Sequence, residues 1–196
     1  MSPFSVPGAF VKTRYILFSA ILSVLLAGCA STDDRKVRAG KLLMEVNDLS
    51  RESSEGMTAG NIQAAIARLD DYKKGFPDKV SQAREDAKPV KDFFEKELIV
   101  DQKTEDKLNE ALSLELPRFD ADCIQGRIKL QKLLTERIES YIGELNLFLD
   151  QSIVDRKVFV AKMEPFENEA ARLTAQGGQA QKEVEAICSK SSFKVK

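Results

Sequence analysis

The chain has 196 residues and a nearly balanced charge, with 30 lysines and arginines against 31 aspartates and glutamates. This balance excludes a polycationic surface of the kind that binds nucleic acid, so no nucleic-acid partner is expected. The chain also contains no histidine, which excludes catalytic sites of the Ser-His-Asp and Cys-His types and the usual zinc ligand sets.

The first 28 residues have the layout of an export signal. Lys12 and Arg14 precede an apolar run from Tyr15 to about Leu26, and small residues follow. The apolar run is roughly half as long as the ~20 residues that a membrane-spanning helix needs. It is therefore too short to cross a membrane by itself, and we expect the segment to be removed after export.

The tetrapeptide from Leu26 to Cys29, Leu-Ala-Gly-Cys, resembles the lipobox of bacterial lipoprotein precursors. The resemblance implies that residues 1–28 are cleaved and that the Cys29 thiol is acylated, which anchors the mature chain in a membrane. An ordinary signal peptide with a soluble product is the alternative, but it would not need a cysteine at the cleavage point. Ala30 and Ser31 lack the aspartate that retains enteric-type lipoproteins in the inner membrane. The resemblance therefore implies the outer membrane, on the periplasmic side.

The mature chain has the composition of a helical protein. It is rich in Ala, Leu, Glu, Lys and Gln, and no window shows the strict alternation of a β-strand. Its length suits one domain, since a chain of about 150 residues buries nearly 70% of its unfolded surface. We expect a tether at 29–34 and a single all-α domain at 35–196, built as a bundle of about five to seven helices.

The first predicted helix follows the tether and ends near Gly56. The second begins after a cap at Asn61 and closes at Gly75 and Pro77. Its apolar residues recur at helical spacing, at Ile62, Ala65, Ile66, Leu69 and Tyr72.

The middle of the chain contains several signals that break or start a helix. A third predicted helix begins near Lys79, and Pro89 is expected to kink it or to start a new segment. Thr104, followed by two acidic residues, reads as the cap of a short helix that Pro117 terminates. A long helix then begins near Asp120.

The last predicted segment runs from about Asp155 to Lys190. Its helical pattern is interrupted at Pro165 and at the pair Gly177 and Gly178, and each glycine costs about 1 kcal/mol against alanine. A break there is one interpretation, and an arm that stays extended overall, which the two cysteines favour, is the other.

The two remaining cysteines, Cys123 and Cys188, predict a disulfide, because exported proteins of an oxidising compartment usually pair their cysteines. A redox or metal-binding pair is the alternative, but neither cysteine lies in a Cys-x-x-Cys motif. If the two helices are antiparallel, their turn should lie midway, near Asp155, where Asp150 and Ser152 are typical turn residues. We therefore expect a hairpin with legs of about thirty residues, joined at its open end.

Carboxylate pairs such as Asp120 and Asp122, or Asp33 and Asp34, stand at predicted helix starts. Capping and helix-dipole roles explain them better than acid–base catalysis. No phosphate-binding loop, nucleophile elbow or calcium loop is present, so we expect no enzyme, no cofactor and no metal.

Four apolar residues, Phe93, Phe94, Ile99 and Val100, spread over more of a helix circumference than one core-facing stripe requires. They predict an exposed patch that binds a partner. The alternative is that this stretch lies in the middle of the bundle, buried on several sides.

The expected function is that of a membrane-anchored periplasmic adaptor or assembly factor, similar in role to a pilotin, whose partner is an unidentified periplasmic or envelope protein. The alternative is an immunity or exclusion lipoprotein that neutralises an incoming toxin or conjugation factor.

Overall fold

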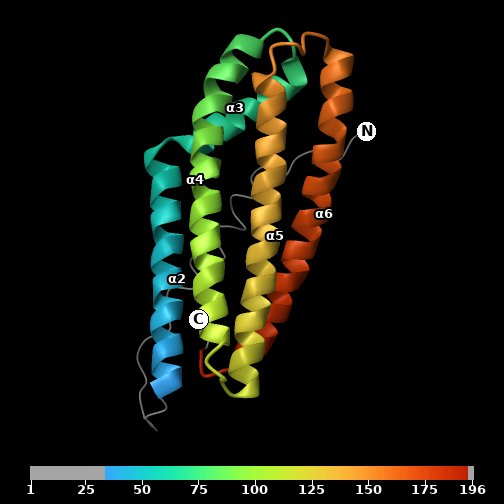
Figure 1. Ribbon diagram of the computed structural model, residues 1–196. Helices are drawn as coiled ribbons and strands as arrows, with labels where there is room; N and C mark the ends of the chain where they lie inside the picture. The colour runs from blue at the N-terminus through green and yellow to red at the C-terminus, as the bar shows by residue number, and fades with distance from the viewer. Residues whose placement is uncertain (1–33, 194–196) are drawn as a thin grey trace.

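The computed structural model describes residues 34–193, and all regular structure in this range is helical (Figure 1). The predicted all-α fold is therefore confirmed, with a helix count inside the expected range. The helices are α2 (Asp34–Ala59), α3 (Ile62–Gly75), α4 (Val80–Leu112), α5 (Arg118–Leu149) and α6 (Arg156–Cys188).

Four long helices lie side by side in the order α2, α4, α5 and α6, and each runs antiparallel to its neighbour (Figure 1). The short helix α3 crosses the bundle at one end, which we call the α3 end. At the opposite end α2 begins and α6 finishes, and we call this the disulfide end. No helix in the described range is long and apolar enough to cross a membrane.

The C-terminal hairpin matches its prediction closely. Its legs α5 and α6 have 32 and 33 residues, and residues 150–155 form the turn between them. Asp155 caps α6, since its side chain accepts hydrogen bonds from the backbone N–H groups of Lys157 and Val158. The Asp150 side chain accepts from the Ser152 backbone N–H at 2.9 Å, which fixes the turn.

In the middle of the chain, the predicted start of a new segment at Pro89 and the separate short helix capped by Thr104 are wrong. Helix α4 continues through Pro89, and Thr104 is a buried residue of its interior rather than the cap of a separate helix. Ala87 and Val90, on either side of the proline, are fully buried. Packing on both sides of Pro89 thus holds the helix together despite the backbone hydrogen bond that the proline removes.

Helix α6 likewise continues through Pro165 and through the pair Gly177 and Gly178. Buried residues recur along its whole length, among them Met163 and Ala180, so contact with α5 offsets the intrinsic cost of these residues.

Two helix ends also differ from prediction. Helix α2 extends to Ala59, beyond the predicted end near Gly56, because Met57 is buried in the core. Asn61 stands at the cap position of α3, as expected, but its side chain makes no capping hydrogen bond. Its backbone is left-handed, with φ of 53°, a conformation that asparagine tolerates better than most residues.

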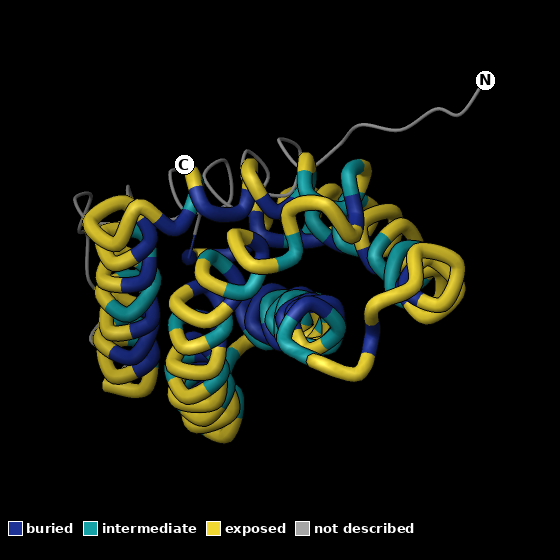
Figure 2. Tube along the Cα trace, turned by 90° about the horizontal axis from the view of Figure 1, so that it is seen from above, coloured by how far each residue is buried: buried dark blue, intermediate teal, exposed yellow. Residues whose placement is uncertain are grey.

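Buried positions face the inside of the bundle and exposed positions cover its outside (Figure 2). The buried side chains form three clusters. The cluster nearest the α3 end, which we call the upper core, joins α3 to α4, α5 and α6. In it Phe76 stacks on Phe159, with 4.1 Å between the ring centroids. The lower core joins α2 to α4 and α5, through residues such as Leu42 and Ile124. The third cluster lies between α5 and α6 around the two cysteines.

Candidate functional site

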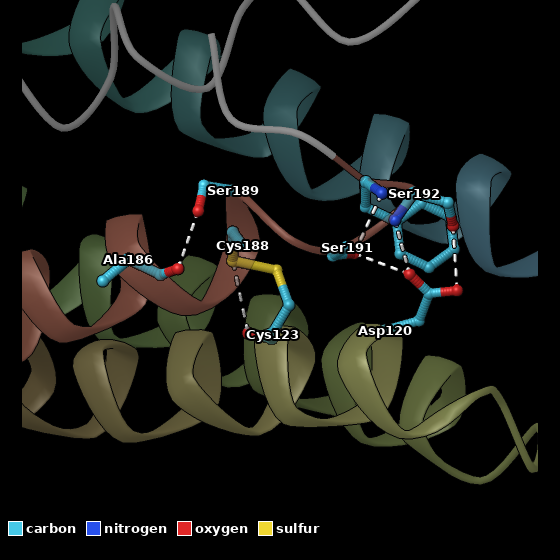
Figure 3. Close-up of a disulfide and its surroundings, with 8 residues drawn as sticks. Asp120, Cys123, Ala186, Cys188, Ser189, Ser191 and Ser192 are labelled. Carbon is cyan, nitrogen blue, oxygen red and sulfur yellow. Dashed lines mark hydrogen bonds between the residues drawn. A yellow bond between two sulfur atoms is a disulfide. The ribbon is translucent and has the colours of Figure 1, made fainter.

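The disulfide end contains the predicted covalent link (Figure 3). Cys123 lies near the start of α5 and Cys188 is the last residue of α6, and their sulfur atoms are 1.97 Å apart. Both cysteines are fully buried, and Leu130 and Val184 belong to the cluster around them. The predicted pairing is therefore confirmed, and it closes the open end of the C-terminal hairpin.

Asp120 holds the C-terminal segment, residues 189–193, against the start of α5 (Figure 3). Its carboxylate accepts from the Ser191 hydroxyl at 2.7 Å, from the Ser192 backbone N–H at 2.6 Å and from the Ser192 hydroxyl at 2.8 Å. The Lys36 ammonium of α2 lies 3.8 Å away. The expected capping role is wrong, because Pro117 is the cap residue and no side chain caps this helix. Asp120 does lie in the first turn of α5, where a carboxylate interacts favourably with the helix dipole.

The C-terminal segment continues from Asp120 to the lower core. Phe193 is buried there beside the α2 residues Ala39 and Leu42. The end of α6 is thus connected to α5 by a disulfide and by hydrogen bonds, and to α2 by apolar packing. A covalent bond, hydrogen bonds and apolar packing thus all join the helices at the disulfide end.

A buried charged cluster attaches α3 to α5. Glu144 is almost completely buried, and its carboxylate lies 2.6 Å from the Lys73 ammonium and 3.6 Å from the Arg137 guanidinium. Asp70 also contacts Lys73, at 3.8 Å. Burial raises the pKa of the Asp70 carboxyl, and Lys73 acts in the opposite direction. Glu144 is held by two cations and so connects α3 to α5, whereas the Oδ2 atom of Asp70 is buried without a hydrogen-bond partner.

A second polar group lies on α4, where the buried residues Glu97, Asp101 and Thr104 recur at helical spacing. The Ser53 hydroxyl of α2 donates to the Glu97 carboxylate, and the Thr135 hydroxyl of α5 donates to Asp101 at 3.3 Å. The sequence did not reveal this group, because acidic residues at helical spacing are usually solvent-exposed.

The predicted partner patch does not form one surface. Phe94 is fully buried and packs edge-on against Phe93 and Tyr141, so its assignment to an exposed patch is wrong. Phe93 and Val100 are partly exposed, and only Ile99 of the four is well exposed, at 59%. Adjacent positions on one helix point about 100° apart, which separates Phe93 from Phe94 and Ile99 from Val100.

Cys29, the predicted lipidation site, lies outside the residues that the structure describes. Within residues 34–193 no group of three or more acidic or cysteine side chains is arranged to hold a metal ion. The sequence matches no protein-family model, and neither the curated proteins nor the solved structures contain a significant match to it.

Proposed function

We propose that this protein is a lipid-anchored component of the bacterial cell envelope that acts by binding another protein, as an adaptor or pilotin-like assembly factor. The observation that carries the proposal is the tetrapeptide from Leu26 to Cys29, which directly precedes a short polar segment and then a helical bundle. Acyl chains on Cys29 would hold the protein on the periplasmic side of the outer membrane.

The geometry of α2 supports a definite orientation for such an anchored protein. Cys29 precedes the start of α2 at Asp34 by five positions, a reach of roughly 20 Å at about 3.5 Å per extended residue. Helix α2 begins at the disulfide end, so this end would face the membrane (Figure 1). The 26 residues of α2 span about 39 Å, which would carry the α3 end far from the bilayer.

A binding role is favoured over an enzymatic one by the state of the buried acids. Glu144 is held by Lys73 and Arg137, and Asp120 accepts three hydrogen bonds from the C-terminal segment. Side chains engaged in this way stabilise a fold and are poorly placed to exchange protons with a substrate.

The lipid anchor is tested by Cys29→Ser. We expect this variant to accumulate as a larger precursor that incorporates no labelled palmitate, because serine lacks the thiol that is acylated. Cys188→Ser is the matched control, since it removes a cysteine from the folded domain and should still be processed and labelled. Palmitate on the Cys29→Ser variant would contradict the anchor.

The partner is tested by a photocrosslinking residue at Val154. This side chain is 70% exposed in the turn between α5 and α6, beside the exposed Val158, at the end that would project from the membrane. We expect a discrete crosslinked product in intact cells. Phe119, which is 54% exposed at the disulfide end, is the control and should give no such product.

The outcomes of this crosslinking separate the possible roles. A resident envelope protein in the Val154 product supports an adaptor or assembly factor, whereas a product formed only with an incoming toxin or transfer protein supports an immunity role. The absence of any product at Val154, or equal products at both positions, would contradict binding at the α3 end.

A further inference from the structure

The Arg127 guanidinium has no counter-charge among the residues that the structure describes. Arg127 lies on α5, one turn beyond Cys123, and is only partly exposed. It makes no hydrogen bond or ion pair in the part of the chain that the structure describes. Burial lowers the pKa of the Arg127 guanidinium to about 10, and no carboxylate offsets this effect.

Gln131 lies one turn further along α5, so its side chain and that of Arg127 are neighbours on one face of the helix. The Nε2 atom of Gln131 is buried and has no hydrogen-bond acceptor. Buried polar groups are nearly always hydrogen-bonded in native proteins, and leaving one unpaired costs about 1–3 kcal/mol. Two adjacent donors without acceptors therefore need an explanation.

The acidic residues that precede Arg127 on α5 are already engaged. The Asp122 carboxylate lies 3.7 Å from the Arg118 guanidinium. Asp120, two turns before Arg127, accepts the hydrogen bonds of Ser191 and Ser192. Asp101 accepts from Thr135, the residue one turn beyond Gln131. The described chain thus supplies no acceptor for the Arg127 guanidinium, although it supplies acceptors for other polar groups of the same helix.

We propose that Arg127 and Gln131 form a recognition site for a carboxylate group carried by a ligand. A guanidinium presents two parallel N–H donors that match the two oxygens of a carboxylate, and the Gln131 amide adds a third donor beside them. The single positive charge of Arg127 balances the single negative charge of a carboxylate. A phosphate dianion would require a second cation.

The position of the site strengthens this interaction. Ile124 and Ile128 belong to the lower core, and Leu130 belongs to the cluster around the disulfide. Arg127 lies between these apolar groups along α5, where a charge-assisted hydrogen bond is less weakened by water than at an open surface. The site does not depend on lipid anchoring, because both residues lie on α5 within the helical domain. The carboxylate can be carried by a peptide or by a small free acid.

The test is a titration of the full-length protein in detergent, at constant ionic strength, with sodium acetate and with N-acetyl-trialanine that ends in a free carboxylate. We expect saturable shifts of the Arg127 Nε–H signal in the NMR spectrum and dissociation constants in the millimolar range. The amidated tripeptide and sodium chloride should have no effect. Acetate alone identifies a site for free acids, and tighter binding of the tripeptide identifies a site for a chain terminus.

Variants distinguish this site from a structural role of Arg127. Arg127→Met should abolish the stabilisation of the protein by acetate while leaving the Tm without ligand unchanged or raised, because it removes an unpaired and partly buried cation. Arg127→Lys should weaken binding about tenfold, since lysine keeps the charge and loses the paired donors. Lys129→Met removes a cation from the same helix that is engaged with Glu183, and it should bind acetate normally.

Three results would overturn the proposal. The first is an acetate response that persists in Arg127→Met, and the second is phosphate that binds more tightly than acetate to the unmodified protein. The third is a Tm of Arg127→Met that falls further than that of Lys129→Met, because this would make Arg127 a structural residue. None of these measurements involves Cys29 or a membrane partner, so their outcome is separate from that of the proposed function.

Discussion

Replacing Phe94 with alanine should lower the free energy of unfolding by about 3 to 5 kcal/mol. The side chain is 0% exposed in the upper core, and its ring packs edge-on against Phe93 at 5.3 Å and against Tyr141 at 5.2 Å. Removing it leaves a cavity between α4 and α5 that the rigid helices can fill only in part. Chemical denaturation followed by circular dichroism measures the loss.

Two neighbouring variants provide the controls. Ile99→Ala, on the same helix, removes an exposed side chain and should change the free energy of unfolding by no more than about 0.5 kcal/mol. Phe93→Ala should lie between the two, because Phe93 is partly exposed and packs at the edge of the upper core. Equal losses for Phe94→Ala and Ile99→Ala would show that Phe94 is not part of the core.

The C-terminal hairpin could be predicted from the sequence because two independent features define the same geometry. The same turn is predicted by two features: the sequence midpoint between Cys123 and Cys188, and the polar residues near Asp155. Two antiparallel helices of equal length that follow this turn bring the two cysteines together at the open end of the hairpin. A disulfide fixes the distance between two positions far apart in the sequence, so the assumed pairing alone predicts how the two helices lie relative to each other.

The continuity of α4 and α6 could not be predicted in the same way. Pro89, Thr104 and Pro165 are local signals of a helix boundary, and each lies inside a helix. Whether such a signal ends a helix depends on the packing of the residues around it, and here buried neighbours favour the helix on both sides. That packing arises from the other helices and cannot be read from a window of the sequence.

The candidate sites show the same limit. The sequence indicated that the pair Phe93 and Phe94 had surplus apolar area, but it could not tell which ring faces the core. It gave no sign of the polar contacts of Glu97, or of the unpaired guanidinium of Arg127. Both depend on which side chains from other helices approach them, and Arg127 stands out only because the acids near it have other partners.

Removing the disulfide should lower the free energy of unfolding by about 4 kcal/mol. Cys123 and Cys188 are separated by 65 residues, and a link across a loop of that length restricts the unfolded chain strongly. The double variant Cys123→Ala and Cys188→Ala removes the link without leaving a free thiol at either position. Before unfolding, the intact mass of the unmodified protein should be about 2 Da lower than after reduction, because the disulfide lacks two hydrogens.

The location of the disulfide sharpens this expectation. Both cysteines are fully buried, so alanine at each position also removes some packing, and the double variant should be less stable than a protein that is reduced without substitution. The Asp120 contacts to Ser191 and Ser192 do not require the sulfur–sulfur bond. We therefore expect the reduced protein to remain folded, with the C-terminal segment exchanging its amide hydrogens faster. Alkylation of both Cys123 and Cys188 in protein isolated without reducing agent, or unchanged stability on reduction, would contradict a structural role for the disulfide.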